Sequence, residues 1–291
     1  MAAIREHRLE LGGFATRALE LSGAADDRPP LLLLHGWSDS ADTWRPLLSQ
    51  LARRGERAIA VDLPGFGEAD RLERERGVLE QLDRFTAAAV EHAGGGGQVT
   101  VVGNSLGGCV AMRLAEDSEL PIAGIVAIAP AGLDMAAWFG LVESAPLVRF
   151  VLRAPVPLPE AVVRDAVGRA YRTLGYARPR EVDPAVVNSF TRHLRSRRDV
   201  IRVLATGRRL LAEIRDPFRL ERIGCPLLLV WGDRDRMVFS TGAERVLDAV
   251  DGSRLELIEG CGHLPQIEAA GRIAELLAGF PEAVAELEPM R

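Results

Sequence analysis

Residues 99–109 read Val-Thr-Val-Val-Gly-Asn-Ser-Leu-Gly-Gly-Cys, and this segment is the strongest single indication of the fold. The β-branched run 99–102 is typical of a buried strand, and the apolar segment 110–115 continues at helical spacing. The Gly-x-Ser-x-Gly sequence between them predicts a nucleophile elbow, a tight turn from strand to helix that exposes Ser105. The serine of such a turn adopts a backbone conformation that costs about 1–3 kcal/mol. Its two flanking glycines avoid clashes with the neighbouring strand and helix.

The same pattern has a second interpretation, because it also fits an ordinary β-to-α loop whose serine caps the helix. In the first interpretation the hydroxyl of Ser105 lies at a helix N-terminus, where free N–H groups favour negative charge. The elbow is the better interpretation only if other parts of the chain supply a base, an acid and an oxyanion site in a suitable order.

The composition fits one large globular domain with an insertion. The chain has 291 residues, is 47% hydrophobic and carries a net charge of −5, which argues against nucleic acid as the main partner. No stretch approaches the roughly 18 apolar residues of a membrane span. Residues 1–8 lack the apolar block of a secretory signal. We therefore expect a cytoplasmic protein.

Two residue types narrow the chemistry. All 36 basic residues are arginine, which excludes Schiff-base and pyridoxal-phosphate catalysis and a Walker-type phosphate lysine. Cys109, Cys225 and Cys261 show no metal-ligand spacing, so we expect reduced thiols and no metal.

The glycine run 94–97 precedes a strand rather than a helix, which is the wrong order for a loop that binds phosphate at a helix N-terminus. The sequence predicts no cofactor.

Apolar runs that alternate with helical segments predict an α/β fold. The run 31–34 is continuous, as in parallel strands buried on both faces, whereas the first two strands alternate and form a hairpin at a sheet edge. We expect a doubly wound, mostly parallel sheet of about eight strands with helices on both faces. The predicted strands are 7–11, 16–21, 30–34, 57–61, 99–102, 122–129, 225–231 and 254–258.

The alternation breaks between residues 133 and 216. This segment shows helical patterns, several prolines, and 15 arginines against 9 acidic residues, a net charge of +6. We interpret it as a helical cap, residues 133–216, inserted into a core formed by residues 1–132 and 217–291.

Partners for Ser105 are expected at the carboxyl ends of the other strands, where parallel sheets carry their chemistry. The strand that ends at Trp231 is followed by Gly-Asp-Arg-Asp, residues 232–235. The strand that ends at Ile258 is followed by Glu-Gly-Cys-Gly-His, residues 259–263. Candidate acid and base thus follow the serine in the order Ser, Asp, His.

The chain resembles the α/β-hydrolase superfamily over essentially its whole length, as a capped serine esterase or lipase-like member. Each matching motif is weak alone, but together they occur in order at strand ends. They are His35-Gly36-Trp37, Asp62-Leu63-Pro64-Gly65-Phe66-Gly67, Gly103-Asn104-Ser105-Leu106-Gly107-Gly108, Gly232-Asp233-Arg234-Asp235 and Gly262-His263. The resemblance implies the α/β-hydrolase fold with an inserted cap.

The chemistry assigns a role to each candidate. Ser105 is a poor nucleophile at neutral pH and needs a base, which His263 supplies by taking its proton. Asp235 fixes the imidazole tautomer and stabilises its protonated form. The resemblance places the oxyanion hole at the backbone N–H groups of Trp37 and Leu106.

Other polar residues compete for these roles. His35 is expected to shape the oxyanion loop rather than act as a base. Asp233 is the rival acid, but Asp235 matches the family's Gly-x-x-Asp spacing. Asp134 follows the predicted strand 122–129, a position where some relatives carry their acid. Asp62 is expected to hold a loop near the site.

Two features of the cap allow either a functional or a structural interpretation. Met135, Trp138, Phe139 and Leu141 could line an apolar acyl pocket, or they could pack the cap on the core. A set of arginines could attract an anionic substrate or an acyl carrier, although a solvated helical face is favoured. These arginines are Arg195, Arg197, Arg198, Arg208 and Arg209.

The sequence therefore predicts a cofactor-free serine hydrolase that acts on a carboxylic ester of small or medium size. A carbon–carbon bond hydrolase of the ring-cleavage type uses the same triad. However, those relatives usually carry His-Gly-x-Gly-Pro-Gly where this chain has His-Gly-Trp-Ser-Asp at 35–39. A cofactor-free perhydrolase would leave the same motifs. A ligand receptor on a hydrolase fold is the alternative from a different class, because fold and motif do not prove turnover.

Overall fold

A computed structural model describes residues 3–23, 28–135, 159–194 and 196–285. Its centre is one sheet with the strand order β1-β2-β4-β3-β5-β6-β8-β10. β1 is antiparallel to β2 and β2 to β4, and the other neighbours are parallel. The predicted eight-stranded, mostly parallel sheet is thereby confirmed. The strands are β1 (Ile4–Leu11), β2 (Phe14–Leu21), β3 (Leu31–Leu34), β4 (Ala58–Val61), β5 (Val99–Asn104), β6 (Ile122–Ile128), β8 (Leu227–Gly232) and β10 (Arg254–Ile258).

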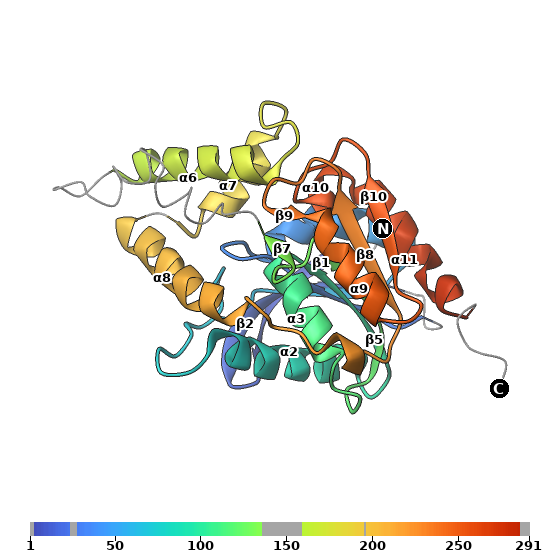
Figure 1. Ribbon diagram of the computed structural model, residues 1–291. Helices are drawn as coiled ribbons and strands as arrows, with labels where there is room; N and C mark the ends of the chain where they lie inside the picture. Colours follow the sequence, from blue (N-terminus) through green and yellow to red (C-terminus); the bar gives the residue numbers. More distant parts are fainter. Residues whose placement is uncertain (1–2, 24–27, 136–158, 195, 286–291) are drawn as a thin grey trace.

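Helices cover both faces of the sheet because its central strands are apolar on both sides (Figure 1). Successive side chains of a strand point to opposite faces. Leu32 and Leu34 therefore pack in one apolar cluster and Leu31 and Leu33 in the other. The first face is covered by α2 (Val78–Gly94), α3 (Leu106–Leu114) and α9 (Ala243–Ala249), and the second by α1 (Arg45–Arg53) and α11 (Ala270–Ala285).

The position of the site follows from the strand order. From β3 the chain moves to β4 on one side and then returns to β5 on the other side. Loops that leave adjacent parallel strands in opposite directions open a crevice at the carboxyl edge of the sheet. The loops after β3 and β5 therefore meet at this edge, together with those after β8 and β10.

The segment between β6 and β8 is mainly helical in its described part, as the sequence predicts. Figure 1 shows its helices on one flank of the sheet, with α6 (Glu160–Gly175) next to α7 (Pro184–Thr191). The last of them, α8 (Arg197–Glu213), begins with a capping box in which Ser196 and Asp199 satisfy each other's backbone amides.

A second, two-stranded sheet is not predicted from the sequence. β7 (Asp134–Met135) pairs antiparallel with β9 (Val238–Phe239). Strands of two residues have no detectable period, so neither alternation nor composition could reveal them. The pair ties the start of the insertion to the loop that follows β8.

Short helices complete the part of the chain that the structure describes. They are η1 (Ala41–Trp44), η2 (Leu220–Arg222), η3 (Ser240–Gly242) and α10 (Pro265–Glu268).

A buried ion-pair network lies under the loop that follows β4. Arg17 of β2 is 1% exposed and donates hydrogen bonds to the carboxylates of Asp42 and Asp62. The Asp62 carboxylate also accepts the backbone amides of Ala41 and Glu68, at 2.6 and 2.8 Å. Asp62 therefore holds two loops in place, in agreement with the structural role expected for it.

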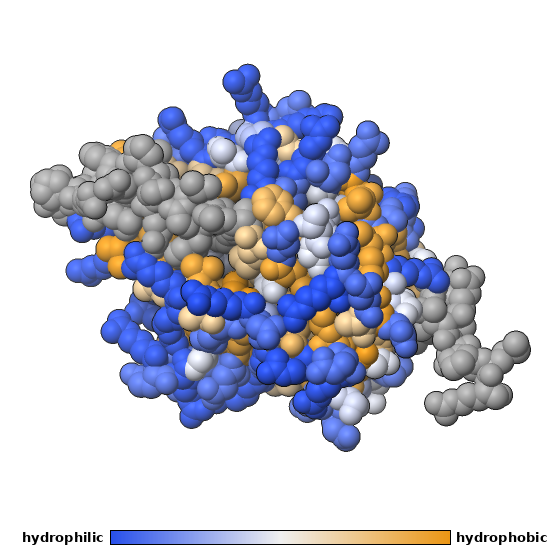
Figure 2. Space-filling model, viewed as in Figure 1, coloured by the Kyte–Doolittle hydropathy of each residue, from blue (hydrophilic) through white to orange (hydrophobic). Residues whose placement is uncertain are grey.

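The surface carries many charged side chains, and in Figure 2 apolar residues are seen mainly in the recesses between them. Of the arginines singled out in the cap, Arg209 donates to the carbonyl groups of Glu73 and Arg76. It therefore helps to attach α8 to the loop before α2. Arg195 lies outside the described residues. Among the helices of the described ranges, none has the length and apolar character needed to cross a membrane.

Candidate active site

The turn after β5 has the geometry of a nucleophile elbow. Ser105 has φ 54° and ψ −113°, a left-handed conformation that side chains rarely adopt. A Cβ atom on Gly103 would lie 2.1 Å from the carbonyl oxygen of Gly107. One on Gly107 would lie 2.1 Å from the carbonyl oxygen of Leu34. The two glycines thus permit a strained turn that fixes Ser105 between β5 and α3.

His263 and Asp235, on the loops after β10 and β8, are in direct contact. Nδ1 of His263 lies 2.7 Å from Oδ2 of Asp235. Oδ1 of Asp235 accepts the amides of Met237 and Val238 at 2.7 and 3.1 Å. A carboxylate can only accept, so Nδ1 of the histidine donates and Nε2 is left as the basic atom of the neutral ring.

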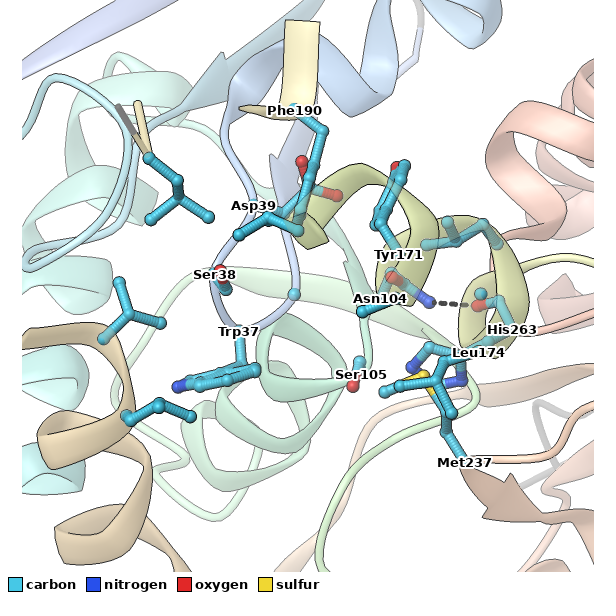
Figure 3. Close-up of a pocket in the computed structure, with 18 of the residues that line it drawn as sticks. Trp37, Ser38, Asp39, Asn104, Ser105, Tyr171, Leu174, Phe190, Met237 and His263 are labelled. Atoms are coloured by element: carbon cyan, nitrogen blue, oxygen red, sulfur yellow. Dashed lines mark hydrogen bonds between the residues drawn. The ribbon is translucent and has the colours of Figure 1, made fainter. Parts of the chain in front are cut away.

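Nε2 of His263 is the free end of this pair. It is buried and has no hydrogen-bond partner within the described part of the chain. Ser105 and His263 line the same cavity, in which Ser105 is 8% and His263 3% exposed (Figure 3). The structure therefore brings the three predicted loops to one place. Nε2, the ring nitrogen that is free to accept a proton, is thus part of a residue that lines the same cavity as Ser105.

The loop after β3 forms the facing wall. A Cβ atom on Gly36 would lie 3.3 Å from Cβ of Ser105, a tight contact, so this loop approaches the serine closely. The loop turns back at Ser38, which has φ 64°, and the amide of Asp39 donates to the carbonyl of Gly36. Trp37 lines the cavity.

The second expected oxyanion donor lies at the start of a helix. Leu106 is the first residue of α3, so its amide has no acceptor within the helix. The predicted donors are thus on the loop after β3, at Trp37, and at the first residue of α3, at Leu106.

His35 is engaged entirely with the backbone. Its Nε2 accepts the amide of Leu63 at 2.8 Å, so Nδ1 carries the proton and donates to the carbonyl of Gly36 at 2.7 Å. Complete burial lowers the pKa of His35 to about 4. This neutral ring joins the loops after β3 and β4, and it shapes the wall of the site as the sequence suggests.

The two rival acids lie in other surroundings. Asp233 accepts the amide of Cys261 at 3.2 Å and pairs with Arg234. Asp134 is exposed and accepts the hydroxyl of Thr241. Of the three candidate carboxyls, Asp235 is the one bonded to His263.

Asn104 is a site residue for which the sequence pattern predicts no role. Its Nδ2 atom donates to the carbonyl of His263 at 3.0 Å and to that of Ile128 at 3.3 Å. The side chain next to the serine therefore holds the backbone of the histidine, as the dashed line in Figure 3 marks. Its place between glycine and serine gave no signal of a contact so distant in sequence.

The insertion supplies much of the cavity wall. The amide of His263 donates to the carbonyl of Gly175 at 2.8 Å, so the end of α6 is bonded to the histidine loop. Side chains of the insertion and the core enclose an apolar space of about 900 Å³ that includes its mouth. The lining from the insertion comprises Val167, Ala170, Tyr171, Leu174, Gly175, Phe190, Leu194, Val200, Val203 and Leu204.

The residues that the sequence suggested for an acyl pocket are only partly described. Met135 packs against an apolar cluster of the insertion that Trp37 also contacts. Trp138, Phe139 and Leu141 lie outside the described residues. The pocket residues of α6 and α8 were missed because helical periodicity does not tell which apolar side chains face a cavity rather than a core.

In the described ranges no cluster of three or more His, Cys, Asp or Glu side chains is arranged to hold a metal ion. Cys109 and Cys261 are buried, Cys225 is half-buried, and all three are free thiols.

Comparison with known proteins identifies similar sequences along nearly the whole chain. Residues 31–276 match the model of the Alpha/beta hydrolase family. The chain is 26% identical to 2-hydroxy-6-oxo-6-(2'-aminophenyl)hexa-2,4-dienoic acid hydrolase of Metapseudomonas resinovorans, with 96% of this chain and 91% of that protein covered. It is 28% identical to pimeloyl-[acyl-carrier protein] methyl ester esterase of Nitrosomonas europaea, with 81% and 89% covered.

A solved structure has the same fold. The crystal structure of a serine hydrolase involved in carbazole degradation superposes with a TM-score of 0.76. It covers 96% of this chain and 99% of its own length at 24% identity.

Proposed function

The chain belongs to the alpha/beta hydrolase family, and from this premise we propose that it is a serine hydrolase that cleaves carboxylic esters of small or medium size. The observation that carries the proposal is the 2.7 Å contact between Nδ1 of His263 and Oδ2 of Asp235. It leaves Nε2 of the histidine in the cavity that Ser105 lines. A histidine held in this way is a base for a serine hydroxyl.

The proposed reaction has two halves. Nε2 of His263 takes the hydroxyl proton as Oγ of Ser105 attacks the ester carbonyl. The tetrahedral intermediate collapses when the histidine returns this proton to the departing alcohol, which leaves an acyl-enzyme. Water then repeats the sequence and releases the acid.

We assign charge stabilisation to the backbone. The amides of Trp37 and Leu106 are proposed to donate to the oxygen that becomes negative in both halves of the reaction. Such preorganised donors are typically worth about 10²- to 10³-fold each in rate. Asp235 stabilises the imidazolium that forms at the same time.

The helical insertion is proposed to be the cap that selects the substrate, with residues 133–216 as its bounds. Its side chains form an apolar wall beside Ser105, and apolar walls favour the hydrocarbon part of an ester. Exclusion of water from this space would also strengthen the electrostatic contacts in the site.

Carbon–carbon bond cleavage is the second candidate. It is supported by the 26% identity to the dienoic acid hydrolase over almost the full chain. The sequence His-Gly-Trp-Ser-Asp at 35–39 departs from the loop usual in such enzymes, and this favours an ester.

One panel of substrates tests both candidates. Purified protein is assayed with p-nitrophenyl esters of increasing acyl length and with vinylogous diketones, beside Ser105→Ala. Ester turnover that disappears in the variant supports the proposal. Turnover of the diketones alone favours the second candidate, and equal turnover by Ser105→Ala contradicts both. Ser49→Ala, an exposed serine, is the matched control.

A further inference from the structure

Among the described residues that line the cavity, one acidic side chain is not used by the proposed reaction. Asp39 lines the cavity and is 6% exposed. It follows Trp37 by two residues, on the same loop as a proposed oxyanion donor. A buried carboxyl in an apolar wall costs free energy unless it meets a partner, so its presence requires an explanation.

The carboxyl of Asp39 has a structural role. Oδ1 of Asp39 accepts the amide of Ser40 at 2.8 Å, and the hydroxyl of Thr43 is also hydrogen-bonded to the carboxyl. These contacts hold the start of η1. They are satisfied as well by an amide as by a carboxylate, so they do not explain why an acid stands at this position.

The surroundings of Asp39 oppose a negative charge on its carboxyl. The largest effects of other charges on Asp39 come from the carboxylates of Asp42 and Asp62. On the facing insertion, burial raises the pKa of the Tyr171 and Tyr176 hydroxyls, and the nearby Asp39 raises it further. Burial is the main cause that raises the pKa of Asp39 to about 7.

The far wall of the cavity is aromatic at this point. The rings of Tyr171 and Phe190 are stacked, with centroids 3.7 Å apart and planes 12° apart. The hydroxyls of Tyr171 and Tyr176 lie 3.2 Å apart and share a hydrogen bond. In the view of Figure 3 the carboxyl of Asp39 lies beside Phe190 and Tyr171, on one side of Ser105, and Met237 lies on the other.

We propose that Asp39 selects substrates that carry a hydrogen-bond donor, a hydroxyl or an ammonium group, on the part that lies against Tyr171 and Phe190. This inference rests on the proposed function for the identity of the bound molecule as an ester. A site built to hydrogen-bond a substrate group rejects the analogue that lacks it, because the buried partner is then left unsatisfied.

Matched esters test the selection. Methyl 6-hydroxyhexanoate and methyl 6-aminohexanoate are each compared with methyl heptanoate, in which a methyl group replaces the donor. 6-Hydroxyhexyl acetate is compared with heptyl acetate, which places the donor on the alcohol instead. We expect kcat/KM to be at least about tenfold higher for the donor in one of these two placements. Acid release in a pH-stat gives the rates.

Variants of Asp39 assign the selection to this residue. Asp39→Leu should bring the ratio between donor and methyl esters close to one. Asp39→Asn, which retains the contacts to Ser40 and Thr43, should retain selection of the hydroxyl and lose that of the ammonium group. Asp165→Leu, an exposed aspartate on α6, is the control and should leave the ratio unchanged. If Asp39→Leu does not fold, loss of ammonium selection in Asp39→Asn is the decisive result.

Failure of this inference can be separated from failure of the proposed function. Hydrolysis of methyl heptanoate that depends on Ser105 tests the function alone. If no ester is turned over, calorimetric binding of the same pairs to Ser105→Ala gives the ratio of affinities. Ratios near one for every pair, or ratios that Asp39→Leu does not change, overturn the role of Asp39.

Discussion

The imidazole of His263 and the carboxyl of Asp235 are joined by a 2.7 Å hydrogen bond between Nδ1 and Oδ2, although the two residues follow different strands. The second oxygen of Asp235 is fixed by the amides of Met237 and Val238. Asn104 holds the backbone of His263 from the elbow itself. The orientation of the imidazole is thus set from two sides before any substrate enters.

Asp235→Asn should reduce kcat by about 10³- to 10⁴-fold while the protein remains folded, because an amide favours the wrong imidazole tautomer. Asp233→Asn is the matched control on the same loop and should change kcat by a factor of a few at most. Ester hydrolysis and thermal unfolding are measured for both variants. Equal losses in the two variants would remove the distinction between these carboxyls.

Gly103→Ala should destabilise the protein strongly, because the new Cβ would lie 2.1 Å from a backbone oxygen that cannot move freely. Gly279→Ala in α11 is the control, since nothing lies within 4 Å of its Cβ position. There alanine should stabilise the helix by about 0.5–1 kcal/mol. Urea denaturation measures both free energies of unfolding, and similar values for the two variants would contradict the tight-turn explanation.

Arg17→Met should lower the free energy of unfolding by about 3–5 kcal/mol, because it leaves the buried carboxylates of Asp42 and Asp62 without their shared partner. Arg5→Met breaks an exposed ion pair with Glu20 on the same hairpin and should cost less than about 1 kcal/mol. Chemical denaturation at neutral pH makes the comparison. A small loss of unfolding free energy in Arg17→Met would mean that the ion-pair network contributes little to stability.

Asp39→Asn should change the pH dependence of stability. Burial raises the pKa of Asp39 to about 7, so the folded state binds a proton that the unfolded state has already lost. The stabilisation from the protonated carboxyl is complete below the unfolded pKa and is lost as the pH rises through about 7. Relative to the wild type, the variant should therefore gain about 2–3 kcal/mol of stability from about pH 5 to about pH 8. Urea denaturation at both pH values measures it, and a constant difference would show that Asp39 titrates normally.

The sequence predicts the sheet and the main site because their signals are local. Continuous apolar runs such as 31–34 identify buried parallel strands. The carboxyl ends of those strands meet at one edge, so Ser105, Asp235 and His263 can be placed together without coordinates. The spacing of glycines in the elbow carries the third signal, since few other residues fit such a turn.

Features that depend on packing could not be predicted. Arg17 appears as a polar residue of an edge hairpin, and nothing in the strand pattern indicates that it is buried between two carboxylates. The contact of Asn104 with His263 depends on how two loops meet. The same applies to Tyr171, whose helical periodicity fits a core position as well as a cavity wall.

Labelling of Ser105 tests whether this serine is an activated nucleophile. The protein is treated with a fluorophosphonate, which reacts with a serine only when a base has activated it, and the modified peptide is identified by mass spectrometry. We expect stoichiometric labelling at Ser105 that is lost in Ser105→Ala and strongly slowed in Asp235→Asn. An unlabelled Ser105 in folded protein would contradict this expectation and favour a binding protein on the same fold.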